Sequence, residues 1–385
     1  MVVHQSDMRP KEKCAVFGVF GASHAVEAAR LSFYGLCALQ HRGQESSGIA
    51  SSDGKKLYRH SEAGLVATVF RETDLANLPG YIAIGHNRYS TSGGQDGCFN
   101  QPFIDTERGF AFAHNGNIPD CGELESFLSS RNVSTDELND SGMMAAAIGL
   151  KLDDGLSLPD AIAACYPLFT GVFSAVAMSK DCLVAFRDKH GIRPLSLGQL
   201  EDGSYVAASE TCALDTIAAA HIREIKPGEM IAIDKTGMHE TQVVPGEQKL
   251  DIFEFVYFAR PDSIILGQTV NDVRMQFGRE MAEECPINAD VVIPVPDSAI
   301  PAALGYAEAS GIPFEMNLIK TAISTEPSFA PRPSYEKTTL NEVEIRSSAP
   351  SRDGVSYLSM TRLYAALPCV KLFLCCERQG RPKYT

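Results

Sequence analysis

The chain has 385 residues, enough for two domains with hydrophobic cores of their own. It is 44% hydrophobic and 21% charged, its apolar runs are too short to span a membrane, and residues 1–13 lack the apolar stretch of a signal peptide. A net charge of −14 without a basic cluster argues against nucleic-acid binding. Eleven cysteines without paired spacing fit a reducing cytoplasm, so we expect a cytoplasmic protein with no membrane partner.

The first two thirds of the chain predict strands and helices in groups rather than in strict alternation. Apolar periodicity predicts strands at 15–20, 65–70, 81–90, 110–118, 171–179, 182–188 and 204–209. It predicts helical segments at 26–40, 141–152, 158–169 and 209–217. This grouping predicts a layered α+β domain over about residues 14–250.

The pattern changes after residue 251. A helix at 270–285 leads into a strand at 289–298, a helix at 299–311 and a strand at 312–320. Strand, helix and strand in this order predict a βαβ unit of the parallel, nucleotide-handling kind.

Cys14 stands between thirteen polar residues and the first predicted strand. If residues 1–13 are a propeptide that is removed, Cys14 becomes the first residue, and its free α-amine can take the thiol proton through a bridging water. Taken alone, such a cysteine is more often a small buried residue at a strand start. The polar clusters elsewhere in the chain favour a nucleophile.

Several of these clusters lie at strand ends and in turns. Arg42 and Gly43 belong to HRGQ, Arg88 to GHNRYSTSGG, Asn115 with Gly116 to HNGNI, and Asp140 to NDSGMM. Each has a structural alternative: Arg88 in a surface ion pair, HNGN as a hairpin turn, and Asp140 as a helix N-cap. Together they supply an oxyanion hole, an arginine for a carboxylate and an aspartate for an ammonium, which suits amide hydrolysis on a free amino acid.

The order of the motifs resembles one family. CAVFG, YGLCALQHRGQE, GHNRYSTSG, QPF, HNGN, RDKHGIRPLSLG, SETCALD, PGE, FVYFARPDS and VPDS follow one another as in the glutamine phosphoribosylpyrophosphate amidotransferases. The resemblance implies an N-terminal-nucleophile (Ntn) glutaminase of four-layer αββα form, followed by a type I phosphoribosyltransferase domain. Families that share the glutaminase half make glucosamine 6-phosphate, asparagine or glutamate, and the second half of the chain separates it from them.

The resemblance also assigns roles. It implies that Cys14 is the nucleophile and that Asn115 and Gly116 form the oxyanion hole. Arg88 would bind the glutamine carboxylate and Asp140 its ammonium. Arg42 and Gly43 would line the same site.

Two residues depart from the family pattern. Asp251 stands where iron–sulfur members have a cysteine, so we expect no iron–sulfur cluster. Lys13 precedes the nucleophile, where a glutamate is common, which makes the cleavage position less certain.

In the second half, Asp297 and Ser298 of VPDS match the region near pyrophosphate and Mg²⁺, with Ser298 as the candidate metal ligand. The family's acidic pair and phosphate loop, roughly DDSxxxGTT, do not follow. The second site is therefore expected to be incomplete, and with it the Mg²⁺ site.

The genetic code suggests a reason. Codons built from the third base of each residue and the first two of the next can read NRYIHRTFIRP from Lys320 onward. In the same register, residues 357–373 can read LIDDSTICGTTMRKIV, whereas 332–345 fit the normal register. We therefore hypothesise that 321–331 and about 346–385 are out of frame, through sequencing error or gene decay. The cysteines of this tail, Cys369, Cys375 and Cys376, are then accidental rather than a metal cluster.

These inferences define four segments: a propeptide at 1–13, a glutaminase domain at 14–250, an incomplete α/β phosphoribosyltransferase domain at 251–345, and an out-of-frame tail at 346–385. The expected reaction converts glutamine, phosphoribosyl pyrophosphate and water to phosphoribosylamine, glutamate and pyrophosphate, the first step of purine synthesis. The chain as written is expected to retain the glutaminase half. The alternative is an inert remnant that only binds partners. A homo-oligomer is expected by analogy if the second domain is complete.

Overall fold

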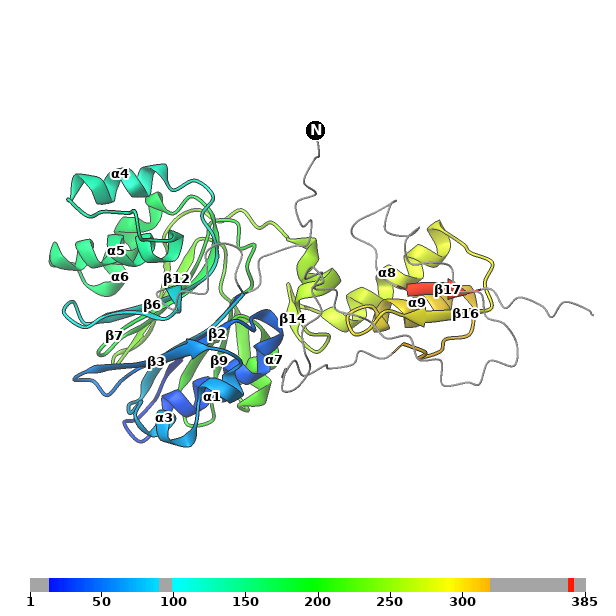
Figure 1. Cartoon of the computed structure of the whole chain (residues 1–385), viewed down its shortest axis with the longest axis horizontal. Coiled ribbons are helices and arrows are strands. Elements are labelled where there is room, and N and C mark those ends of the chain that lie inside the picture. Colours follow the sequence, from blue (N-terminus) through cyan, green and yellow to red (C-terminus); the bar gives the residue numbers. More distant parts are fainter. Residues whose placement is uncertain (1–13, 90–98, 319–372, 377–385) are drawn as a thin grey trace, which may run out of the picture. The chain divides into compact units, whose positions relative to one another are not determined.

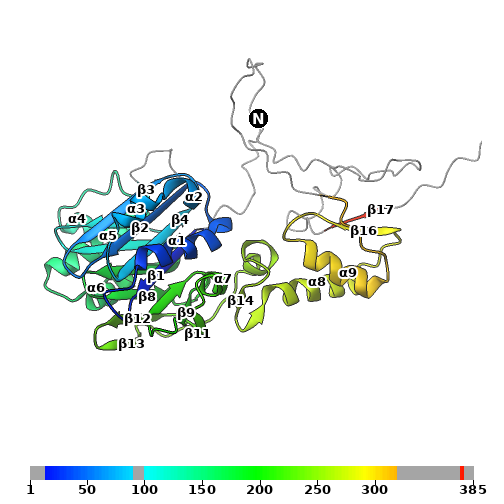
Figure 2. The same ribbon diagram turned by 90° about the horizontal axis from the view of Figure 1, so that it is seen from below.

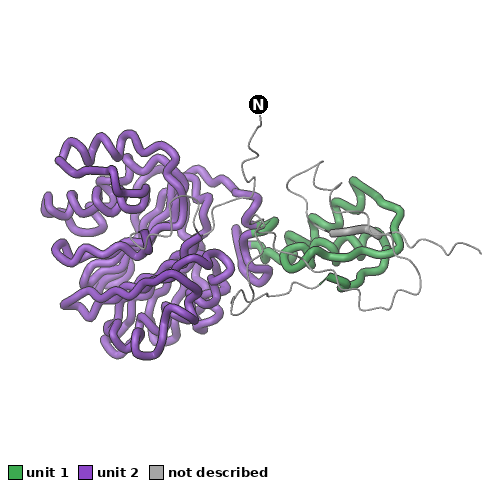
Figure 3. The backbone as a smooth tube through the Cα atoms, viewed as in Figure 1, with its two compact units in different colours: residues 1–8, 255–257, 268–385 green, residues 9–254, 258–267 purple. Residues whose placement is uncertain are grey.

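The computed structural model describes residues 14–89, 99–318 and 373–376, which form two compact units (Figure 3). The N-terminal unit comprises 14–254 and 258–267, and the C-terminal unit comprises 255–257, 268–318 and 373–376. The predicted propeptide and most of the predicted out-of-frame tail lie outside the described residues. None of the helices in the described segments is long and apolar enough to cross a membrane.

The N-terminal unit contains two antiparallel sheets (Figures 1 and 2). The first has the strand order β11-β9-β10-β1-β4-β2-β3. Its strands, in chain order, are β1 Ala15–Phe20, β2 Ser46–Ser52, β3 Leu57–Ala63, β4 Ile82–Arg88, β9 Ser196–Gln199, β10 Tyr205–Ala208 and β11 Ala220–Glu224. Strand β1, which follows Cys14, is central and pairs with β4 and β10.

The second sheet has the strand order β13-β12-β8-β7-β6-β5. Its strands are β5 Phe103–Asp105, β6 Phe110–Asn117, β7 Val172–Ser179, β8 Leu183–Arg187, β12 Glu229–Asp234 and β13 Gly237–Gln242. The HNG segment lies within β6, where Asn115 pairs with Ser174 of β7. The structure therefore excludes the alternative in which HNGN is a hairpin turn.

The helices cover the outer faces of the two sheets. They are α1 Ala28–Ala38, α2 Val66–Val69, α3 Glu72–Ala76, α4 Gly122–Ser130, α5 Asp140–Asp153, α6 Leu158–Cys165 and α7 Thr211–Thr216. One core lies between the first sheet and the helices α1, α2, α3 and α7, and another between the second sheet and α4, α5 and α6. A third core joins the two sheets through residues such as Val16, Ile84 and Ala113. Three cores between four layers confirm the predicted αββα form.

One sequence expectation about this unit is wrong, and several of its elements were not predicted. Residues 65–70 were expected to form a strand, but Val66–Val69 is the short helix α2. The sequence analysis also missed β2, whose SSGIASS sequence is buried along its whole length. Its serine hydroxyls are satisfied inside the protein: Ser51 Oγ donates to Pro79 O (2.9 Å) and Ser52 Oγ to Lys180 O (2.7 Å). Because serines are buried here, β2 lacks the apolar alternation that marks a strand.

The C-terminal unit follows the predicted order of elements up to residue 311. It contains β15 Gln268–Thr269, α8 Val270–Glu284, β16 Val291–Pro294 and α9 Ile300–Ser310, and the two helices enclose a small core around Val292 and Tyr306. The predicted strand at 312–320 is reduced, within the described residues, to a parallel bridge between Phe314 and Val292.

One short segment of the tail differs from the expectation. Phe373–Cys376 forms β17, which pairs antiparallel with β16, Val291 lying opposite Cys376. The sequence analysis predicted no element within residues 346–385, whereas these four residues form a strand. The pairing satisfies backbone groups along an edge of β16 that would otherwise be exposed.

The packing of α1 on the first sheet yields a stability prediction. Leu36 of α1 has no exposed surface and belongs to the core that includes Phe17 and Ala83. Leu36→Ala should lower the free energy of unfolding by about 2–5 kcal/mol through lost burial and a residual cavity. Leu156→Ala is the matched control, because Leu156 is 39% exposed and should cost less than about 1 kcal/mol. Urea denaturation followed by far-UV circular dichroism measures both changes, and equal losses would contradict the packing described here.

Candidate active site

Cys14 lies at the N-terminal end of β1, opposite the C-terminal end of β4. Ala15 pairs with Asn87, and the Cys14 thiol contacts the backbone of Tyr89: Sγ lies 3.7 Å from Tyr89 O and accepts from Tyr89 N–H at 3.5 Å. Burial raises the pKa of the Cys14 thiol, and the Tyr89 N–H, Arg88 and Arg193 act in the opposite direction. The net shift is upward, so Cys14 is a protonated thiol at neutral pH and needs a base to become a nucleophile.

Asn115 supplies an unused hydrogen-bond donor. Its side chain is 2% exposed, and its Nδ2 has no hydrogen-bond partner among the described residues. Val16 and Ala113 both belong to the core between the sheets. Because side chains alternate along strands, Cys14, two residues before Val16, and Asn115, two residues after Ala113, point to the same layer. A buried donor without a partner is costly unless a ligand or water satisfies it.

Gly116 adds a backbone donor next to it. Phe173 of β7 lies opposite Gly116. Both backbone groups of Phe173 bond to Asp188: Phe173 O accepts from Asp188 N–H, and Phe173 N–H donates to the side-chain Oδ2. The backbone N–H and C=O of Phe173 therefore point away from β6. The Gly116 N–H is then not bonded to β7 and points to the opposite edge of β6. On that edge the His114 N–H already donates to Gln101 Oε1 at 2.7 Å. A Cβ at position 116 would lie 2.0 Å from Val172 O, so only glycine fits.

Asp140 is the first residue of α5, and Asn139 is the N-cap, with its Oδ1 accepting from Gly142 N–H at 2.8 Å. The alternative that Asp140 is the cap is therefore wrong. Asp140 Oδ2 accepts from Ile118 N–H (3.2 Å), at the end of the strand that carries Asn115. Its Oδ1 accepts from Ser141 N–H (2.7 Å). These bonds fix the carboxylate near β6, where a cationic ligand group can approach it.

Arg88 ends β4, and its guanidinium lies over the Phe99 ring, 5.7 Å from the centroid. The small residues that follow it in the sequence, 90–98, lie outside the described residues. Gly43 packs against the same strand end: a Cβ there would lie 2.7 Å from the Asn87 carbonyl. The absence of a side chain at 43 lets the HRG segment approach β4.

Arg42 does not occupy the position of a substrate ligand. Its side chain has no exposed surface, and Nε donates to Cys14 O at 3.1 Å. Nη1 and Nη2 donate to two buried carboxylates, Glu210 (2.5 Å) and Glu254 (2.8–3.1 Å). With its donors directed to protein groups, Arg42 contacts the nucleophile's own backbone rather than a free carboxylate.

The ion cluster around Arg42 stays charged despite its burial. Burial opposes the charge on Arg42, but Glu254 and Glu210 together raise its pKa. Burial likewise opposes the charge on Glu210, but Arg42 and His41 lower its pKa. Glu210 also accepts from Ser263 Oγ (2.6 Å) and Arg260 N–H (2.9 Å). Removing one member of such a cluster leaves a buried charge unpaired, which typically costs about 3–5 kcal/mol.

The sequence analysis assigned no role to four residues that surround these groups. Glu210 lies in SETCALD, Glu254 in the segment before FARPDS, and Arg193 in GIRP, where its Nη1 lies 3.5 Å from Glu254 Oε1. His114 is buried, with Nδ1 2.8 Å from Ser141 Oγ and a pKa lowered chiefly by burial. The only sequence signal for them was their place inside family motifs or, for Glu254, directly before one.

The N-terminal unit extends past the predicted domain boundary at residue 250 because of these contacts. Glu254, Arg260 and Ser263 all bond to the cluster, so the segment that carries them belongs to this unit. In the C-terminal unit, Asp297 and Ser298 lie in the turn between β16 and α9, with Asp297 exposed. No group of three possible metal-ligating His, Cys, Asp or Glu side chains occurs within residues 14–89 and 99–318. One carboxylate and one hydroxyl do not complete a Mg²⁺ site, so the described residues do not fit this ion by themselves.

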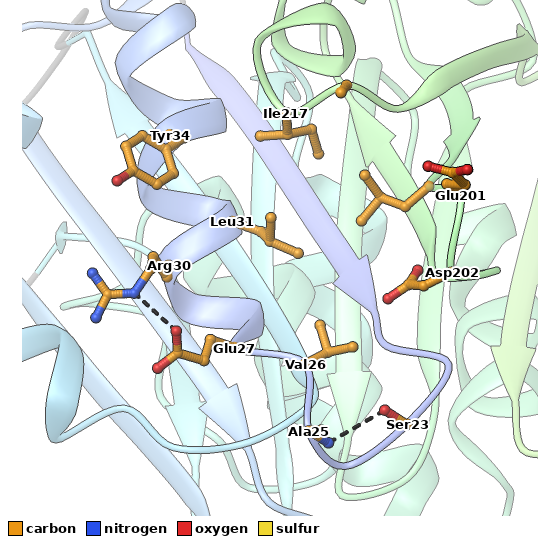
Figure 4. Close-up of a pocket in the computed structure, with 12 residues that line it drawn as sticks. Ser23, Ala25, Val26, Glu27, Arg30, Leu31, Tyr34, Glu201, Asp202 and Ile217 are labelled. Atoms are coloured by element: carbon orange, nitrogen blue, oxygen red, sulfur yellow. Dashed lines mark hydrogen bonds and ion pairs between the residues drawn. The ribbon is translucent and has the colours of Figure 1, made fainter.

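A separate pocket of about 550 Å³ lies between α1, the turn after β9 and the end of α7 (Figure 4). Its lining includes Arg30, Tyr34 and Asp202, and Arg30 pairs with Glu27. None of the predicted site residues lines it.

Comparison with known proteins agrees with this geometry. Residues 86–216 match the family model described as a glutamine amidotransferase domain. The chain is 42% identical over 326 residues to the amidophosphoribosyltransferase of Synechocystis sp., covering 82% of this chain and 65% of that protein. It is 40% identical to that of Synechococcus elongatus, covering 86% and 68%.

Among solved structures, the glutamine phosphoribosylpyrophosphate amidotransferase of B. subtilis, complexed with ADP and GMP, superposes with a TM-score of 0.75 at 38% identity. The match covers 83% of this chain and 69% of that one. The chain thus spans about two thirds of the length of these relatives, or slightly less. With this identity over most of its length, the chain belongs to the amidophosphoribosyltransferase family.

Proposed function

We propose that the N-terminal unit hydrolyses glutamine, with Cys14 as the nucleophile. The observation that carries this proposal is the buried Asn115 amide, whose Nδ2 has no partner within the described part of the chain. It adjoins a glycine N–H on the same strand and faces the layer that holds the Cys14 thiol. A buried donor of this kind suits a charge that develops during reaction.

The chemistry follows from the groups present. Once residues 1–13 are removed, the α-amine of Cys14 takes the thiol proton through water, and the thiolate attacks the side-chain carbonyl carbon of glutamine. Asn115 Nδ2–H and Gly116 N–H hold the resulting oxyanion. The amine returns its proton to the leaving nitrogen, ammonia departs, and water hydrolyses the thioester to release glutamate. Arg88 and Asp140 hold the carboxylate and ammonium of the substrate.

For the complete reaction, we propose that the ammonia attacks phosphoribosyl pyrophosphate. The products are phosphoribosylamine and pyrophosphate, at the start of purine synthesis. A related solved structure is titled as an allosteric regulatory enzyme of purine biosynthesis. The family resemblance implies Mg²⁺ for this step, but Asp297 and Ser298 do not complete a site for it in the chain as written. The acidic pair and phosphate loop that this step needs are absent from the sequence as written.

Cys14→Ala should abolish thiol-dependent glutamate release from purified protein, because it removes the thiol that forms the thioester in this mechanism. Cys37→Ala is the matched control: Cys37 is a partly buried cysteine on α1 and should leave turnover unchanged. Intact-mass measurement of the active protein should show that residues 1–13 are gone. Full activity in protein that retains Met1 would rule out the terminal-amine mechanism, and no glutamate release from protein with Cys14 exposed would favour an inert remnant.

Asn115 and Asp140 should give opposite kinetic signatures. Asn115→Ala should lower kcat by about 10²–10³-fold, because it removes a donor used mainly in the transition state. Asp140→Asn should mainly raise KM for glutamine, because its charge acts on a group remote from the scissile bond. Asp160→Asn, in the first turn of α6, is the control for the loss of a helix N-terminal charge. Steady-state kinetics with varied glutamine separate the two effects, and interchanged signatures would refute these roles.

The chain as written should make no phosphoribosylamine from added ammonia. A chain restored to the shifted register at 321–331 and 346–385 should regain this activity, since it recovers the acidic pair and the amide cradle. Consumption of phosphoribosyl pyrophosphate with ammonia, measured for both chains side by side, decides the point. Turnover by the written chain would reject the out-of-frame hypothesis, and failure of a folded restored chain would count against the second-domain assignment.

A further inference from the structure

The backbone carbonyl of Cys14 is held by one buried side chain. Arg42 Nε donates to Cys14 O at 3.1 Å, and the Arg42 side chain has no exposed surface. This bond fixes the peptide group between Cys14 and Ala15. The remaining freedom of the nucleophile is then mainly rotation of its own side chain, so the position of Sγ depends on the position of the Arg42 guanidinium.

Two carboxylates orient Arg42 in turn, and they differ in their other partners and in how they contact it. Glu210 has several other partners, including His41 Nε2 at 2.8 Å and Ser263 Oγ at 2.6 Å. Glu254 meets Arg42 in a two-pronged contact, with Oε1 2.8 Å from Nη2 and Oε2 3.1 Å from Nη1. A planar fork on a carboxylate sets both the distance and the plane of a guanidinium, which a single contact does not.

We propose that Glu254 is a positioning residue for the nucleophile: it orients the Arg42 guanidinium, which holds the Cys14 carbonyl and so sets the attack geometry of Sγ. The proposal rests on Cys14 being the nucleophile of the proposed glutaminase. Glu254 lies beyond the residues matched by the glutamine amidotransferase domain model and does not contact the substrate in the mechanism given above. Its effect should therefore fall on turnover rather than on substrate affinity.

The chain provides a matched control. Glu229 is also buried and also meets an arginine in a two-pronged contact, with Arg223 Nη1 and Nη2 each 2.8 Å from its carboxylate. Within the described part of the chain, the contacts of that pair do not involve Cys14 or Arg42. Glu229→Gln therefore removes a similar ion pair without affecting the nucleophile's backbone.

The experiment compares the mature wild-type protein with Glu254→Gln, Arg42→Lys, the double variant and Glu229→Gln. Glu254→Gln should lower kcat for glutamine hydrolysis by about 10–100-fold, the usual range for a lost charge-assisted contact, with KM nearly unchanged. The double variant should be no slower than the slower single variant, because both substitutions break one chain of contacts. Glu229→Gln should keep wild-type kinetics.

A second readout does not depend on turnover: the rate at which iodoacetamide alkylates Cys14, followed against pH by peptide mass spectrometry. The charged groups that influence this thiol are Arg88, Arg193 and Asp140, with Arg42 at its carbonyl. Loss of the Glu254 charge leaves the arginines less compensated, so the alkylation profile should move by about half a pH unit or more toward lower pH. A larger thiolate fraction together with a lower kcat would show that the nucleophile is no longer held in its attack geometry.

The outcomes separate the proposals. Wild-type kinetics and an unshifted alkylation profile for a folded Glu254→Gln protein would overturn the role of Glu254, as would additive effects of Glu254→Gln and Arg42→Lys. If wild type itself does not hydrolyse glutamine, the proposed function fails, and the positioning role of Glu254 fails with it. If circular dichroism shows that Glu254→Gln does not fold, Glu254→Asp replaces it: the shorter acid should lower kcat about 3–10-fold with an unshifted profile, and wild-type kinetics would refute the proposal.

Discussion

A single buried guanidinium joins four distant parts of the sequence. Arg42 contacts the carbonyl of Cys14 and the carboxylates of Glu210 and Glu254, and all three contacts lie in the interior of the N-terminal unit. Charges in such a place must be paired, because their desolvation is not otherwise compensated. The cluster therefore constrains where β1 begins, where the turn after α1 lies, and how the segment after β13 returns to the unit.

The cluster shows why groups that act at contact distance depend on the packing of segments that are far apart in the sequence. Cys14 lies at the start of β1 in one sheet, and Asn115 and Gly116 lie on β6 in the other, so these groups meet only if the two sheets pack in a fixed register. The core between the sheets provides that register through interlocking apolar side chains. At the edge of this core, polar groups replace apolar ones, and the Asn115 amide keeps a donor that no described residue uses.

The acidity of the Cys14 thiol also depends on the surrounding fold. Burial makes the Cys14 thiol a weaker acid, and the nearby Arg88 and Arg193 oppose that effect only in part. A resting thiol avoids oxidation and side reactions but requires a base at the moment of attack. A terminal α-amine titrates near neutrality, which suits this task and is the chemical reason for the proposed removal of residues 1–13.

The sequence by itself determined the family and, through it, the αββα layering and the candidate site residues. Motif order and apolar periodicity are local properties. They predicted the bounds of β1, β4, β6, α5 and α8 within a few residues. They also identified the candidate site residues Cys14, Asn115 and Asp140. It failed where local pattern and burial disagree: β2 is built of buried serines, and Val66–Val69 has β-type residues in a helix.

Only the tertiary structure decided the role of Arg42, because a site ligand and a backbone anchor have the same local sequence. It also decided that Glu254 belongs with the first unit, since that assignment depends on a pairing between residues more than two hundred positions apart. Chemistry carried by one residue can be recognised in sequence, whereas a buried charge is understood only when its partners are known.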